Sequence, residues 1–136
     1  MYRVRRIDYF STTVRDRPGA AYELLDVLAG IGINLLAFTA VPMGPVTTQL
    51  TIFPEDSAKL ENEARLDHLS LDGPHPALMV QGDDELGVLA DIHRTLSRAN
   101  VNVYATTGVS TGHGNFGYIV YVRPEQFAAA ASALDL

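Results

Sequence analysis

A chain of 136 residues, 47% of them hydrophobic, can bury one good core or two small cores that support each other. The formal net charge of −6 argues against a general nucleic-acid binder, because such proteins need a basic face to neutralise phosphates. The absence of cysteine excludes disulfides, thiolate metal sites and thiol catalysis.

The first part of the chain predicts a strand, a helix, a strand hairpin and a second helix. The expected elements are a strand at 7–14, a helix ending near Ile31, strands at 33–41 and 46–53, and a helix at about 55–67. Asp16 is placed to cap the first helix, and Pro18 lies in its first turn, where a missing N–H costs nothing. Apolar residues from Ala21 to Ile31 recur at helical spacing and predict one buried helix face.

The second part of the chain predicts the same order of elements. They are a strand at 77–82, a helix at 85–99, strands at 101–109 and 116–123, and an alanine-rich helix from Pro124. The stretch 72–76, Asp-Gly-Pro-His-Pro, predicts a turn-rich break that is too short to be a flexible linker.

The two parts are related by a shift of 68 residues. The shift places Asp16-Arg17-Pro18-Gly19 on Asp84-Glu85-Leu86-Gly87 and Asn34 on Asn102. After an expected two-residue insertion in the second hairpin, Pro54 falls on Pro124. We therefore divide the chain into a first repeat, residues 1–70, and a second repeat, residues 71–136. Right-handed crossovers place both helices of a repeat on one face of an antiparallel sheet, so the predicted fold is α+β with two ferredoxin-like βαββαβ repeats.

These residues resemble the ACT domain, a regulatory module of enzymes of amino-acid metabolism. The resemblance rests on Arg15 to Gly19 with the helix behind it and on Gly32-Ile33-Asn34. The second copy keeps Asp84, Gly87, Val101 and Asn102, with Leu86 in place of the usual proline. The resemblance implies a free-standing tandem ACT protein that binds a small molecule, commonly an amino acid, and has no catalytic domain.

The chemistry of the two turns suits an amino acid. A helix N-terminus offers unpaired N–H groups to a carboxylate, and Gly19 or Gly87 allows close backbone approach. Asp16 or Asp84 is suited to receive the ammonium group. The alternative reading of each turn is purely structural, with the aspartate as an N-cap and the glycine as a turn residue.

The expected ligand-binding residues lie in the two turns and at the starts of the strands that follow the helices. They are Asp16, Arg17, Pro18, Gly19, Ala20, Asn34, Leu35, Asp84, Glu85, Leu86, Gly87, Val88, Asn102 and Val103. We expect the turns to face a groove shared by the repeats. The first turn is favoured, because the acidic run 83–85 of the second repels a carboxylate and suits an ammonium group or another cation.

Other motifs predict no further chemistry. Residues 112–117, Gly-His-Gly-Asn-Phe-Gly, satisfy G-x-G-x-x-G but precede a strand and not a helix, so we interpret them as a hairpin tip. The four histidines share no ligand spacing, and no serine or threonine is flanked by a base. His93 replaces Leu25 of the first repeat at the edge of the buried helix face. We therefore expect no metal, no cofactor and no enzymatic activity.

Three functions stay open. The favoured one is a module that senses an amino acid and passes its occupancy to a partner protein; the others are a small enzyme on the same fold and an interaction module without a ligand. We also expect a homodimer, because sheets of this kind expose their edges. We expect residues 2–6 to pair with the second repeat and 7–14 with the first. Without a leader or a long apolar run, the chain reads as soluble and cytoplasmic, with no membrane partner.

Overall fold

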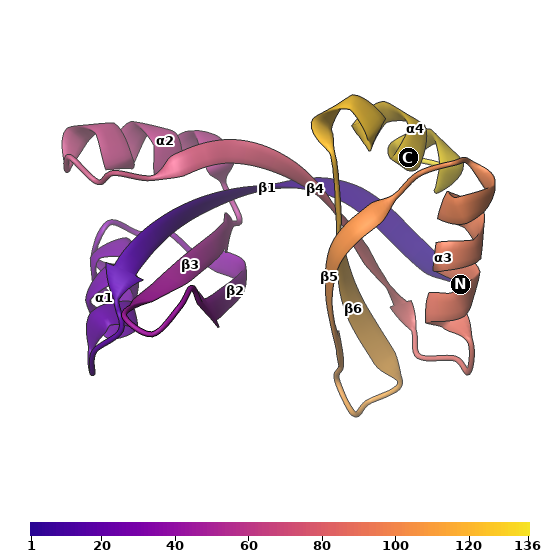
Figure 1. The fold of residues 1–136 in the computed structure, drawn as a ribbon, viewed down its shortest axis with the longest axis horizontal. Helices are drawn as coiled ribbons and strands as arrows, with labels where there is room; N and C mark the ends of the chain where they lie inside the picture. Colours follow the sequence, from indigo (N-terminus) through magenta and orange to yellow (C-terminus); the bar gives the residue numbers. More distant parts are fainter. The chain divides into compact units, whose positions relative to one another are not determined.

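The computed structural model describes all residues from Met1 to Leu136 (Figure 1). Its elements follow the order β1 Tyr2–Arg15, α1 Ala20–Gly30, β2 Leu35–Pro42, β3 Thr47–Pro54, α2 Ser57–Leu66, β4 Asp72–Asp83, α3 Val88–Arg98, β5 Val103–Ser110, β6 Asn115–Val122, the 3₁₀ helix η1 Pro124–Gln126 and α4 Phe127–Ala133. The order of strands and helices is the one that the hydrophobic periodicity predicts. None of the helices has the length and apolar character needed to span a membrane.

The chain forms two compact units that do not coincide with its two halves. The continuous unit is Asp8–His75, and the split unit combines Met1–Ile7 with Pro76–Leu136. The strand order is β2-β3-β1-β4 in the continuous unit and β1-β4-β6-β5 in the split unit. The long strands β1 and β4 each contribute one part to each unit. This division is the one that an exchange of strands between two repeats would produce.

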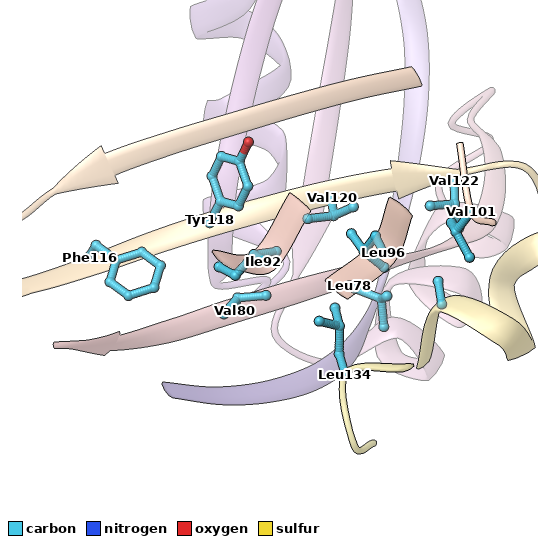
Figure 2. Close-up of a cluster of buried hydrophobic side chains, with 11 residues drawn as sticks. Leu78, Val80, Ile92, Leu96, Val101, Phe116, Tyr118, Val120, Val122 and Leu134 are labelled. Carbon is cyan, nitrogen blue, oxygen red and sulfur yellow. The ribbon is translucent and has the colours of Figure 1, made fainter. Parts of the chain in front are cut away.

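Each unit buries apolar side chains from both of its helices against its strands. In the split unit the cluster consists of Leu78, Val80, Ile92, Leu96, Val101, Phe116, Tyr118, Val120, Val122, Ala130 and Leu134 (Figure 2). In the continuous unit it consists of Phe10, Leu28, Ile33, Ile52 and Leu60. The strand residues of each cluster alternate along the chain and so share one face, which places both helices on the same face of the sheet.

The backbone hydrogen bonds repeat at the 68-residue spacing. The pairs are Asp16 N to Val46 O with Asp84 N to Gly114 O, Glu23 N to Gly19 O with Asp91 N to Gly87 O, Ile33 N to Leu28 O with Val101 N to Leu96 O, and Met43 N to Thr47 O with Thr111 N to Asn115 O. The spacing holds through both hairpins. The expected insertion in the second hairpin is therefore wrong; the two extra residues lie after β6, between Val122 and α4.

The expected turn at Asp72–Pro76 is wrong, because these residues form the beginning of β4, although the boundary between the two units does fall among them, between His75 and Pro76. Although glycine and proline are common in turns, these residues have an extended conformation here. At Gly73, a β-carbon would approach the carbonyl oxygen of Tyr9 and the ring of Phe10, and the backbone has a φ of 152°. Glycine at this position therefore allows the backbone to lie close to β1, although the sequence pattern indicates a turn.

Candidate functional site

Both Asp-x-x-Gly segments form the same turn before a helix. In the first, the N–H of Ala20 donates to the carbonyl of Arg17 over 3.3 Å, and in the second the N–H of Val88 donates to that of Glu85 over 3.1 Å. Gly19 and Gly87 have φ values of 86° and 84° with ψ near zero. These values are typical of the third residue of a type II β-turn, which requires a positive φ and so favours glycine.

This turn corrects the prediction that Asp16 caps the first helix. The N-cap residue of α1 is Gly19, without a side-chain cap hydrogen bond, and the N-cap residue of α3 is Gly87. Proline and glycine at consecutive positions favour a type II turn, so the helix starts only after the turn is complete. The aspartate consequently lies three residues too early to cap, and its side chain is exposed in both turns.

In the first turn, the Arg17 side chain forms an ion pair with Glu23. Arg17 donates to a carboxylate oxygen of Glu23 over 2.6 Å and to the carbonyl of Pro18 over 3.3 Å. The Arg17 side chain is 50% accessible to solvent, and the Glu23 side chain is 61% accessible. Water screens such a pair, so Glu23 restrains Arg17 only weakly.

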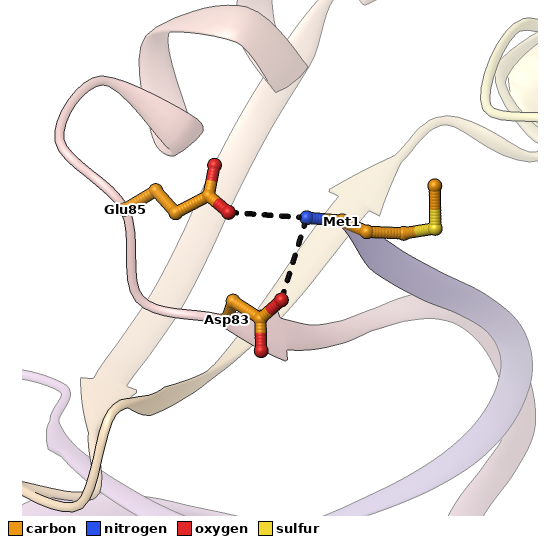
Figure 3. Close-up of polar contacts among 3 residues, drawn as sticks. All are labelled: Met1, Asp83 and Glu85. Carbon is orange, nitrogen blue, oxygen red and sulfur yellow. Dashed lines mark hydrogen bonds and ion pairs between the residues drawn. The ribbon is translucent and has the colours of Figure 1, made fainter.

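The second turn carries three carboxylates, two of which lie beside the same ammonium group. The ammonium group of Met1 lies 3.7 Å from a carboxylate oxygen of Asp83 and 3.4 Å from one of Glu85 (Figure 3). Asp84 instead accepts a hydrogen bond of 2.9 Å from the hydroxyl of Ser110 on β5. The acidic run thus attracts an ammonium group in the structure, as its charge leads one to expect.

Asn34 and Asn102 do not join the turns of their own units. In each unit the turn precedes an 11-residue helix and the asparagine follows it, so roughly 16 Å of helix separates them. Asn34 donates to the Glu55 carboxylate over 2.7 Å, and the backbone N–H of Asn102 donates to the Gln126 side chain over 3.0 Å. Leu35 and Val103 begin the adjoining strands β2 and β5. Within a unit, these residues form structural contacts at the far end of the helix.

A pocket of about 430 Å³ lies beside the second turn, inside the split unit. Its walls are Asp84, Val88, Leu89, Thr106, Gly108, Val109, Ser110, Phe116, Gly117 and Tyr118. Two of the expected residues, Asp84 and Val88, are among them. The strand residues were missed, although isolated glycines inside a strand pattern indicate close approach of another group and could have drawn attention to β5 and β6.

Tyr118 combines a buried ring with a polar end in this pocket. It is only 7% exposed, and its ring lies over Gly108, its partner in the β5–β6 pairing. Its hydroxyl lies 2.7 Å from Nε2 of His93 on α3. Figure 2 shows this hydroxyl pointing away from Val80 and Ile92. The pocket therefore has apolar walls, a carboxylate at the turn and a hydrogen-bonded phenol.

The corresponding positions of the continuous unit, 68 residues earlier, carry larger or apolar side chains. Thr106, Gly108, Gly117, Tyr118 and His93 correspond to Phe38, Ala40, Gln49, Leu50 and Leu25. Ala40 faces Leu50 in the β2–β3 pairing as Gly108 faces Tyr118 in the β5–β6 pairing. Phe38 packs against the core of the continuous unit. Small residues on β5 and β6 thus open space that bulkier residues occupy in the continuous unit.

The first half of the glycine-rich segment 112–117 forms a hairpin tip, as predicted, and its second half begins β6. The N–H of Thr111 donates to the carbonyl of Asn115, and Gly112 and Gly114 have positive φ values. The carbonyl of Gly114 accepts from the N–H of Asp84 over 2.8 Å. This bond and the Ser110–Asp84 bond fasten the hairpin to the second turn. No group of three or more His, Asp or Glu side chains lies close enough together to hold a metal ion.

No family model and no curated protein matches the chain. Solved structures do match. Protein BT0572 from Bacteroides thetaiotaomicron is 18% identical, with a TM-score of 0.80 over 96% of this chain and 88% of that one. The ligand-free regulatory subunit of aspartate kinase from Thermus thermophilus is 17% identical, with a TM-score of 0.62 over 96% and 94% of the two chains.

The regulatory subunit of aspartate kinase from Thermus flavus is also similar, with 17% identity and a TM-score of 0.58 over 98% of this chain and 94% of that chain. These likenesses confirm the α+β, ferredoxin-type fold class that the order of elements predicts. They extend over nearly the whole of each chain.

Proposed function

We propose that the protein is a tandem ACT-like regulatory module that binds a small metabolite, an amino acid in the first instance, in the pocket of the split unit. The observation that carries this proposal is the meeting of Asp84, the start of α3 and the Phe116 and Tyr118 rings around one cavity. Its volume of about 430 Å³ lies in the roughly 300–1,000 Å³ range of small-molecule sites.

The chemistry of the pocket matches the parts of an amino acid. Asp84 and the acidic run beside it attract the ammonium group. Apart from that of Val88, which donates to the Glu85 carbonyl, the N–H groups of the first turn of α3 lack partners within the helix and favour a carboxylate. Leu89 and Phe116 offer apolar surface to a side chain. A zwitterion therefore finds an acceptor, donors and an apolar wall within one pocket.

The proposed regulatory role is supported by the fold that the chain shares with the regulatory subunits of aspartate kinase. In this proposal each unit is one ACT-like repeat, completed by a strand segment from the other half of the sequence. In this proposal, a partner protein responds to whether the split unit has a ligand bound. The first turn, with Asp16 and Arg17, is a second proposed contact for ligand.

The test is a thermal-shift screen of the 20 common amino acids, followed by calorimetry on those that raise the melting temperature. A ligand that binds only the native state must stabilise it. Asp84→Asn should weaken binding at least about tenfold, since it removes the charge opposite the ammonium group. Asp16→Asn is the matching substitution at the equivalent turn and shows how much that turn contributes. Equal losses in both variants would implicate both turns, and binding lost only in Asp16→Asn would move the site to the first.

We also propose that the protein forms a homodimer through an outer strand. β5 is the last strand of its sheet and is exposed along most of its length, with Tyr104 and Val109 54% and 68% accessible. An exposed apolar edge is normally covered by assembly. Light scattering at micromolar concentration should give twice the chain mass of 14.7 kDa, and the mass of a single chain would contradict this proposal.

A further inference from the structure

We propose that the His93–Tyr118 pair makes the pocket of the split unit selective for ligands that carry an uncharged hydrogen-bonding group, such as a hydroxyl or an amide, on the part that enters it. This inference rests on the proposed ligand-binding function of the same pocket. It assigns a specificity role to two residues, of which Tyr118 lines the pocket and His93 holds the tyrosine hydroxyl.

The phenol of Tyr118 has hydrogen-bonding capacity that His93 does not use. A tyrosine hydroxyl has one donor and two acceptor positions, and the 2.7 Å contact with Nε2 of His93 uses one of them. At 7% exposure, Tyr118 has little access to bulk water. The remaining capacity is open to water or a ligand inside the pocket. An apolar ligand that displaces this water leaves the hydroxyl with its His93 contact alone, whereas a polar ligand replaces the lost bond.

The fold itself does not require the polar pair of His93 and Tyr118. In the continuous unit, Leu25 and Leu50 occupy the equivalent positions on α1 and β3, where two leucines satisfy the packing. A buried polar pair must be hydrogen-bonded to be tolerated, which makes it a more demanding solution than two leucines. The polar pair occurs in the unit whose strand residues leave a cavity beside it.

Contacts from two neighbouring elements hold Tyr118 in place. His93 fixes the hydroxyl from α3, and Gly108 gives the ring room on β5. The two ring systems of His93 and Tyr118 meet edge to face with centroids 5.8 Å apart. A phenol held at both ends keeps one orientation, and a fixed orientation is what allows a polar group to discriminate between ligands.

The class of ligand follows from both ends of the pocket. Asp84 provides a negative charge at the turn, and Tyr118 provides a neutral hydrogen-bonding group. The expected ligand is therefore a small primary amine, such as an amino acid, with a neutral polar side chain. Sites that hydrogen-bond a ligand hydroxyl discriminate strongly against analogues that lack it, because the buried polar group is then unpaired.

The experiment compares pairs of amino acids of similar shape by calorimetry: threonine with valine, asparagine with leucine, and tyrosine with phenylalanine. For at least one pair, the wild-type protein should bind the polar member about tenfold or more tightly. Tyr118→Phe should abolish this ratio without weakening the apolar member. His93→Leu, which installs the residue of the continuous unit, should reduce the ratio by releasing the hydroxyl. Tyr104→Phe is the control, because the same oxygen is removed from a tyrosine outside the pocket.

The outcomes separate the two proposals. A wild-type preference for the apolar members, or an unchanged ratio in Tyr118→Phe, would overturn the selectivity inference while the binding function stands. Binding of none of the probes by the wild-type protein would overturn both. Circular dichroism and melting temperature establish that each variant is folded, and should Tyr118→Phe not fold, the ratio in His93→Leu decides.

Discussion

Gly108 on β5 lies opposite Tyr118 on β6, and a β-carbon built on this glycine would stand 2.6 Å from Cδ1 and 3.1 Å from Cε1 of the tyrosine ring. The ring thus covers the glycine backbone, an arrangement that protects a strand glycine and uses an aromatic cross-strand partner. The tyrosine cannot tilt toward β5 or be pushed away without moving its hydroxyl from His93. The glycine is therefore part of what positions the phenol.

Gly108→Ala should lower the free energy of unfolding by about 1–3 kcal/mol, the usual cost of overpacking, and weaken any ligand that depends on Tyr118. Urea denaturation measures the first effect and calorimetry the second. Gly117→Ala is the matched control for the stability measurement, since a β-carbon at this strand position meets nothing within 4 Å. Equal destabilisation by the two substitutions would contradict the proposed contact and indicate a general sensitivity of β5 and β6 to a side chain.

Gly82→Ala should loosen the start of β1. A β-carbon at position 82 would lie 2.6 Å from the Cα atom of Tyr2 and would also meet the carbonyl oxygen of Met1. The contact is with backbone, which cannot rotate away as a side chain does, so the strand itself must move. We expect a loss of about 1–3 kcal/mol in the free energy of unfolding and faster amide exchange in residues 2–7.

Gly30→Ala, at the end of α1, is the control for this substitution. Its β-carbon has no neighbour within 4 Å and its φ is not positive, so the change should leave stability unchanged or raise it slightly. Unaltered exchange of residues 2–7 in Gly82→Ala would mean that the start of β1 is not held against β4.

Leu28→Ala and Leu96→Ala test whether each unit has its own core. The two leucines are equivalent under the 68-residue shift, and both are almost fully buried, in the continuous and the split unit respectively. Each substitution should lower the free energy of unfolding by about 2–5 kcal/mol because it leaves a cavity. Leu86→Ala, at a fully exposed turn position, should change it by less than about 0.5 kcal/mol. A small effect of either core substitution would contradict the tight packing of that unit.

Tyr121 should make the protein less stable in alkali. Burial, with a smaller contribution from the nearby Tyr104 phenol, raises the pKa of Tyr121 from 10.0 to about 12. The unfolded chain therefore loses this proton at a lower pH than the folded protein, so between about pH 10 and 12 the free energy of unfolding falls as pH rises. Urea denaturation of wild type and Tyr121→Phe at several pH values measures the difference. Parallel pH dependences of the two proteins would rule out this contribution.

Most of the elements could be predicted from sequence because hydrophobic periodicity sets them locally. The errors occurred where a longer-range contact decides. Pro18 and Gly19 read as the first turn of a helix, but they form a type II turn before it, and the two readings use the same residue types. The composition of Asp72–Pro76 indicates a turn, but contacts with the neighbouring strand hold this segment extended.

The pocket could be predicted only in part. The sequence pointed to Asp84 and Val88 because the turn repeats, but it gave equal weight to Asn102, which lies beyond the far end of α3. The opposite wall depends on which strand residues face the helix start, and that depends on the register of β5 against β6. A shift of one residue would turn those side chains to the other face. The sequence pattern alone does not specify this register.

The division of the chain into a continuous and a split unit also has a kinetic consequence. The continuous unit has all its residues, Asp8–His75, once synthesis has reached His75, whereas residues 1–7 must wait for Pro76–Leu136. The contact between Met1 and Glu85 joins residues 84 positions apart. Such contacts raise the contact order of the split unit, and long loops close slowly. Residues 1–7 are thus expected to be among the last to reach their native partners, and the core beside the pocket is expected to form more slowly than the core of the continuous unit.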